Sequence, residues 1–143
     1  MQATLYVADD IQSLAEGKTL MVGVFTDRVV VLNVPPETVE MVNKGTPLGL
    51  AALALMFTIT DIEPGEHVGA PRITLPNGEP SPNQVEPSPF SVPKGGAANL
   101  LLKFQPFFVI GAGKYDVTVE VDGVPVSADF EVRVAPVAKQ EGS

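Results

Sequence analysis

The amino-acid sequence predicts an all-β domain, built as an antiparallel two-sheet β-sandwich. Near its end, apolar and polar residues alternate over 115–121 and again over 126–134, on either side of Asp122-Gly123, as in a β-hairpin with one buried face. Short β-branched runs also recur along the chain between turns, and the 143 residues include 14 prolines and 13 glycines. A hydrophobic fraction of 45% is enough for one core.

The first quarter of the chain predicts three strands. Residues 3–8 form the first strand, and residues 11–17 form a connection with room for one helical turn. Residues 18–25 are apolar on both faces, which favours a central strand. Residues 28–34 form a β-branched strand that Pro35-Pro36 ends, because proline cannot donate to a β-ladder.

The middle of the chain is less regular. Residues 37–44 predict a short helix that ends at Gly45. Residues 50–60 combine helix formers with strand formers, and their position between turn signals favours a buried strand. Residues 61–70 are expected to form a polar loop, and residues 72–75 a short strand.

Residues 76–93 contain prolines at positions 76, 80, 82, 87, 89 and 93. This density excludes an ordinary strand or helix and predicts an extended, polyproline-like surface arm. Such arms lose little entropy when they bind along a groove or a sheet edge, so this one is the best candidate for contacting a partner. A mobile loop is the equally weighted alternative. The candidate partner-binding residues are Pro82, Gln84, Val85, Pro87, Pro89 and Phe90.

After the arm, residues 100–110 resume the strand alternation, with an interruption at Pro106, and the closing hairpin follows. Phe107-Phe108 is expected to be buried at a sheet crossing, with an exposed apolar patch as the alternative. The whole pattern predicts seven to nine short strands in a single domain over residues 1–135, followed by a polar tail over residues 136–143.

Two resemblances extend this interpretation. The pattern Gly111-x-Gly113-x-Tyr115-x-Val117 resembles the tyrosine corner of immunoglobulin-like sandwiches, in which a tyrosine hydroxyl bonds to upstream backbone. The resemblance implies an immunoglobulin-like architecture and no activity. Gly111 stands where an acidic residue is usual, Val117 stands where antibody domains have cysteine, and the chain has no tryptophan.

The first third of the chain resembles an uncharacterised family of bacterial and phage proteins, a domain of unknown function. The residues concerned are Ala8-Asp9-Asp10, Glu16-Gly17-Lys18 and the run 20–25. This resemblance implies a product carried by a phage or prophage, and it brings no known activity.

Composition excludes several classes of function. The net charge of −8 and the singly scattered basic residues argue against nucleic acid or an anionic membrane as a partner. Because the chain has no cysteine, disulfides and zinc–thiolate sites are excluded. The start of the chain lacks the pattern of a signal peptide, and the longest apolar run, 48–57, is too short to span a bilayer. We therefore expect a soluble product made in the cytoplasm.

Three groups of residues have side chains that could form a chemical site. Gly17-Lys18-Thr19 is like the end of a phosphate-binding loop, but Gln12 stands where that loop needs glycine and a strand follows it. Asp61, Glu63, Glu66 and His67 could gather around a metal ion, although their spacing matches no known metal motif, and a solvated acidic loop is the simpler interpretation.

The third group is the pair Asp9-Asp10 with Asp27-Arg28, which could act as paired carboxylates. Strand-end aspartates that accept backbone N–H bonds are commoner. His67 is the only histidine and no G-x-S-x-G motif is present, so a serine hydrolase is not indicated. We expect neither a catalytic residue nor a cofactor.

The function expected from these features is structural. The leading expectation is a non-enzymatic phage virion component, such as a capsid decoration or tail-associated protein, that binds a phage capsid or tail protein and forms a homo-oligomer. One alternative is a cytoplasmic module that binds a protein or a small ligand. A second alternative is a metal-assisted hydrolase using the loop that contains Asp61 and His67.

Overall fold

The structure, a computed structural model, describes residues 1–137 and confirms an all-β chain. Strands account for 61% of the residues and helical segments for 10%. The strands are β1 (Gln2–Ser13), β2 (Thr19–Val24), β3 (Val29–Val34), β4 (Leu48–Leu50), β5 (Leu53–Thr60), β6 (Gly65–Thr74), β7 (Ser88–Val92), β8 (Ala98–Phe104), β9 (Phe107–Val109), β10 (Gly113–Val121) and β11 (Val124–Pro136), and the α-helix is α1 (Pro36–Asn43).

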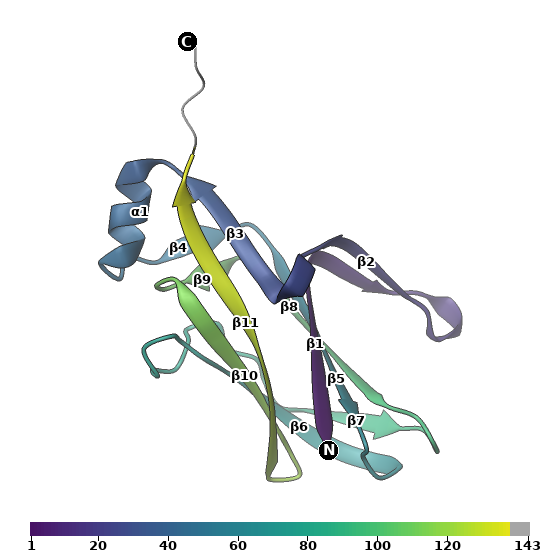
Figure 1. The fold of residues 1–143 in the computed structure, drawn as a ribbon. Helices are drawn as coiled ribbons and strands as arrows, with labels where there is room; N and C mark the ends of the chain where they lie inside the picture. The colour runs from purple at the N-terminus through teal and green to yellow at the C-terminus, as the bar shows by residue number, and fades with distance from the viewer. Residues whose placement is uncertain (138–143) are drawn as a thin grey trace.

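The strands form two main sheets and one small one (Figure 1). One sheet has the order β2-β1-β5-β8, the other has the order β3-β11-β10-β6-β7, and β4 pairs with β9. Neighbouring strands are antiparallel except β3 and β11, which run parallel, with Val29 opposite Glu131. The expectation of purely antiparallel sheets is therefore wrong at this pair, because side-chain alternation carries no information about strand direction.

The core lies between the two main sheets. Its buried side chains come from both of them and join in one cluster that includes Val7, Phe57, Val119 and Val132. Aromatic rings fill one end, where Phe107 lies 5.2 Å from Phe104 and 6.1 Å from Phe130 between ring centroids. The alternation seen in the sequence corresponds to burial on one face of β10, whereas β5 is buried on both faces.

Tyr115 is completely buried and makes the backbone contacts that its sequence pattern predicts. Its hydroxyl donates to the Gly111 carbonyl at 2.7 Å and accepts from the Ile110 N–H at 2.9 Å. Burial raises the pKa of Tyr115 to about 12. These two bonds fasten the loop before β10 to the core.

The closing hairpin is confirmed. Residue pairs run from Gly113 opposite Val132 to Val121 opposite Val124, with Asp122 and Gly123 as the two turn residues. Both have positive φ, 50° and 86°, which is the backbone of a type I′ turn and explains the Asp-Gly dipeptide. The hairpin occupies the centre of the five-stranded sheet.

The prediction of a central strand over 18–25 is wrong. β2 is an edge strand with β1 as its neighbour, and its apolar side chains Leu20, Val22 and Val24 are 44%, 50% and 52% exposed. Hydrophobic composition on both faces cannot distinguish a strand buried between neighbours from one that carries an exposed apolar face. The far half of β1 and β2 instead cover a second, small cluster, in which Ile11 and Met21 pack with Met56.

The predicted loop over 61–70 is also wrong in part, because β6 begins at Gly65 and continues to Thr74. Glycine and proline are uncommon inside strands, so the glycines of β6 and Pro71 kept the sequence pattern from predicting this strand. Together with β4, β7 and the division of 98–109 into β8 and β9, this gives eleven strands in residues 1–137, more than the predicted seven to nine.

The expectation that the first strand ends before residue 11 is wrong, because β1 runs from Gln2 to Ser13. Several other expectations hold or lie partly outside the described residues. α1 forms where a helix was predicted, and β3 and β5 match the strands expected over 28–34 and 50–60. Phe107 is buried, as expected, whereas Phe108 is 41% exposed. β11 continues to Pro136, and residues 138–143 of the predicted tail lie outside the described residues. Within residues 1–137 no helix has the length and apolarity needed to cross a membrane.

Candidate partner-binding surface

The proline-rich segment 76–93 runs along the free side of β6. An isolated bridge joins Pro80 to Thr74, and the Ser81 N–H donates to the Ile73 carbonyl at 2.9 Å. Residues 88–92 then form β7, an edge strand paired with the first part of β6. The prediction that no strand could form in this segment is therefore wrong. An edge strand tolerates proline because one side of its backbone needs no partner.

Asn83 holds the middle of this segment to the body of the protein. Its side-chain NH₂ donates to the Phe108 carbonyl and to the Ser81 hydroxyl, both at 2.8 Å. Its side-chain oxygen accepts the Phe108 N–H at 2.7 Å. The amide thus pairs with β9 as a neighbouring strand would. Ser81 and Asn83 are the only buried polar side chains recorded for residues 1–137.

The six candidate residues fall into two classes around this anchor. Val85 and Phe90 are half-buried and pack against the core, whereas Pro82, Gln84, Pro87 and Pro89 are exposed. Pro82 and Gln84 flank buried Asn83, so the arm alternates inward and outward like a strand. The structure thus places a fixed row of exposed side chains on a segment whose other side is bonded to the protein.

A groove of about 310 Å³ lies between this segment and the five-stranded sheet. Arg72 and Glu120, which lie 3.7 Å apart, border it on the sheet side, and Gln84 and Val85 border it on the arm side. The lining of the groove therefore combines apolar side chains with two amides, Asn83 and Gln84, and one ion pair.

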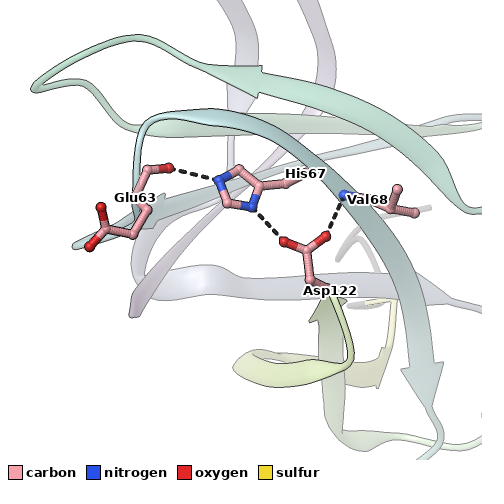
Figure 2. Close-up of polar contacts among 4 residues, drawn as sticks. All are labelled: Glu63, His67, Val68 and Asp122. Atoms are coloured by element: carbon pink, nitrogen blue, oxygen red, sulfur yellow. Dashed lines mark hydrogen bonds and ion pairs between the residues drawn. The ribbon is translucent and has the colours of Figure 1, made fainter.

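His67, in β6, is bonded to the turn of the closing hairpin through Asp122 (Figure 2). Its Nδ1–H donates to the Asp122 carboxylate at 2.6 Å, and its Nε2–H donates to the Glu63 carbonyl at 2.7 Å. The other oxygen of Asp122 accepts the Val68 N–H at 2.9 Å. Because both ring nitrogens face acceptors, this arrangement requires the imidazolium form.

Each group in this cluster favours the charged form of the other. The Asp122 carboxylate, followed by the Glu63 carbonyl, raises the pKa of His67 above its ordinary value. The Val68 N–H, followed by His67, lowers the pKa of Asp122. The imidazole ring also stacks on Phe90, with 5.6 Å between centroids. His67 thereby couples the end of the arm to the hairpin turn.

The side chains of the four candidate metal ligands do not converge on one point. Asp61 and Glu63 border a shallow hollow with Gly95 and Gly96, Glu66 accepts a hydrogen bond from the Ser91 hydroxyl, and His67 is bonded to Asp122. Residues 1–137 contain no cluster of three or more His, Asp or Glu side chains that could hold a metal ion. The geometry gives the metal-assisted hydrolase no support.

The other sequence candidates take structural positions. Gly17-Lys18-Thr19 leads into β2 and not into a helix, so it lacks the helix N-terminus that a phosphate-binding loop uses. Asp10 accepts from Gln12 at 2.9 Å and lies 3.3 Å from Lys103, and these contacts lower its pKa. Asp9 borders a different hollow from the one that Asp27 and Arg28 border.

Sequence reasoning missed Asn83 and Asp122 as functional positions. One feature of the sequence could have indicated the role of Asn83, because it is a polar residue between prolines in a segment that alternates like a strand. Asp122 was assigned only to its turn, because its partner His67 lies 55 residues away in sequence. A comparison with models of protein families finds no match, and a comparison with curated proteins finds none either.

Proposed function

We propose that the chain is a non-enzymatic structural protein that binds a repeated protein surface, as a phage virion component on the capsid or tail. The observation that carries this proposal is the anchored arm. Ser81 and Asn83 fix its backbone while Pro82, Gln84, Pro87 and Pro89 face outward. A segment that is already ordered loses little conformational entropy on binding.

The proposed body for this arm is an immunoglobulin-like sandwich. Supporting it, the order β6-β10-β11 corresponds to strands C-F-G of that fold, and β1-β5-β8 corresponds to strands A-B-E. The contacts of the Tyr115 hydroxyl with upstream backbone also agree with it. The phage context rests on the resemblance of the first third of the chain to an uncharacterised family of bacterial and phage proteins. It implies a protein made in the host cytoplasm and carried in the virion as a homo-oligomer.

The test is binding to capsids from the source of the chain. Cosedimentation and negative-stain images should find the protein at regular positions on the lattice. A variant with Gln84→Glu and Pro87→Glu should lose this binding while its circular dichroism stays unchanged, and Val124→Glu, an exposed change on the hairpin, is the matched control. A strictly monomeric protein that ignores capsids and tails would overturn the proposal.

A second candidate function, a cytoplasmic module that binds a small ligand, has one observation in its favour. An apolar hollow of about 330 Å³ opens between the two main sheets, bordered by Phe25, Leu32, Leu50 and Leu53 with Asp9 at its side. Its size is at the lower end of ligand sites. Ala52→Leu would fill the hollow, so a ligand that raises the melting temperature of the native chain should not raise that of the variant.

A further inference from the structure

β2 offers an unpaired strand edge whose side chains are apolar and exposed. The strand pairs with β1 on one side and has no strand on the other among residues 1–137. Leu20, Val22 and Val24 are each about half exposed, with values between 44% and 52%. In Figure 1 the β1–β2 hairpin projects away from the body, so no other element covers this edge.

The main chain of β2 is free to accept another strand. The Leu14 N–H donates to the Lys18 carbonyl at 2.7 Å, which turns the backbone groups of Lys18 toward β1. Backbone groups alternate in direction along a strand, so those of Thr19 and Met21 face outward. Water can bond to such a row of exposed N–H and C=O groups, and another extended segment can replace that water with a ladder of hydrogen bonds.

Over residues 19–22 this edge lacks the charges and prolines that normally prevent edge-to-edge pairing, and the strand is distorted only beyond them, at Gly23, whose φ is 67°. Thr19–Val24 contains no charged residue and no proline. One acid and one base flank it at each end, Glu16 with Lys18 before it and Asp27 with Arg28 after it. The segment 14–28 is therefore neutral in a chain of net charge −8. Two copies that repel one another elsewhere can approach here.

We propose that β2 pairs antiparallel with β2 of a second copy of this chain, about a two-fold axis close to Met21. The outward backbone groups of Met21 bond to those of the other Met21, and Leu20 of each copy faces Val22 of the other. An isologous contact of this kind matches apolar residues with apolar residues. The Glu16–Lys18 end of one copy then lies beside the end of the other copy that carries Asp27 and Arg28, so the two ends that meet are each neutral.

The pairing joins two four-stranded sheets into one continuous sheet of eight strands. The contact is small, because a six-residue edge buries less than the roughly 1,200–2,000 Å² of a stable interface. We therefore expect a reversible dimer whose population rises with protein concentration. The inference rests on the homo-oligomer part of the proposed function, and names the surface responsible for it.

The experiment is sedimentation equilibrium of the native chain over a concentration series from about 1 μM to about 1 mM, where an edge contact of this size should associate. Val22→Lys should weaken dimerisation at least tenfold, since it places two like charges across the axis. Val22→Glu should do the same. An equimolar mixture of the two variants should form a heterodimer, because the charges are then opposite.

Two controls keep the test specific. Val124→Lys changes an equally exposed valine on the closing hairpin, and Val31→Lys changes an exposed valine on β3, the edge strand of the other sheet. Both should leave the dimer constant within about twofold, since additivity holds for distant sites. Circular dichroism of each variant verifies that it is folded.

The outcomes separate the two proposals. A chain that dimerises regardless of Val22→Lys, or whose dimer is lost with Val31→Lys instead, overturns the β2 contact and leaves the proposed function standing. Two Val22 variants that stay monomeric when mixed also overturn it. A native chain that is monomeric at every concentration overturns both the β2 contact and the homo-oligomer. The capsid-binding experiment then tests whether the rest of the proposed function, binding to a capsid or tail, is correct.

Discussion

Replacing Asn83 with alanine should release the proline-rich arm from the body of the protein. The substitution removes three hydrogen bonds, two to the backbone of Phe108 and one to the Ser81 hydroxyl, with lengths of 2.7–2.8 Å. At about 1 kcal/mol net for each bond, the loss is about 3 kcal/mol. Water can reach the half-exposed Phe108 and satisfy part of its backbone, so we expect a net loss of about 2 kcal/mol.

That loss is large enough to measure and small enough to leave the protein folded. A domain of this size is typically stable by about 5–15 kcal/mol, and its unfolding entropy is about 0.3 kcal/mol/K, so 2 kcal/mol lowers the melting temperature by about 7 °C. Urea unfolding followed by far-UV circular dichroism gives the free energy of unfolding directly. Gln84→Ala, a neighbouring exposed amide, is the matched control and should change stability by less than about 0.5 kcal/mol.

A second readout tests whether the effect lies in the arm. The Ser81 N–H of the arm is bonded to the Ile73 carbonyl, so it should exchange with solvent deuterium faster in the Asn83→Ala variant than in the native chain. If the variant unfolds at the same urea concentration as Gln84→Ala and its Ser81 N–H exchanges no faster, the anchoring role of Asn83 is refuted. The ordered-arm argument for function would then lose its basis.

Three further predictions follow from the other contacts. Because the pKa of His67 is raised, the stability that His67 contributes is complete below its unfolded pKa of about 6.5 and is lost as pH rises through its folded pKa. Because the pKa of Asp122 is lowered, the stability that Asp122 contributes is lost at low pH, where the carboxylate protonates. His67→Gln should abolish the decline above about pH 6.5. Proton NMR of the single histidine should give a pKa that falls in Asp122→Asn, and a folded-state pKa below about 6.5 contradicts this. Tyr115→Phe removes two hydrogen bonds at a completely buried site and should cost about 2 kcal/mol in urea unfolding, with the exposed Tyr6→Phe near zero. Gly123→Ala forces alanine to a φ of 86° and should cost about 1 kcal/mol or more, and an unchanged melting temperature would exclude the type I′ turn.

The parts of the fold that sequence reasoning found are those with local signals. The closing hairpin has strict alternation on both arms and two turn residues that accept positive φ, so local propensity and tertiary structure agree. β3 and α1 were predicted correctly because Pro35 follows the end of the strand and Pro36 begins the helix. In each case the pattern that identifies the element lies within the element itself.

The parts that were missed depend on distant residues. β2 has the composition of a central strand, and only the placement of β1 and β5 makes it an edge. β7 exists because β6 offers it a ladder, which the proline count alone could not reveal. The anchor at Asn83 needs Phe108, 25 residues away, and such a partner leaves no trace in local spacing.

The parallel pairing of β3 with β11 also governs when folding can finish. Val29 meets Glu131, about a hundred residues later in the chain, so β3 stays without its neighbour until β11 has been synthesised. During that interval the uncharged run Val29–Val34 has the composition of an aggregation-prone segment. The last strand therefore protects the nascent chain, and slowing translation ahead of it should lower the yield of correctly folded protein.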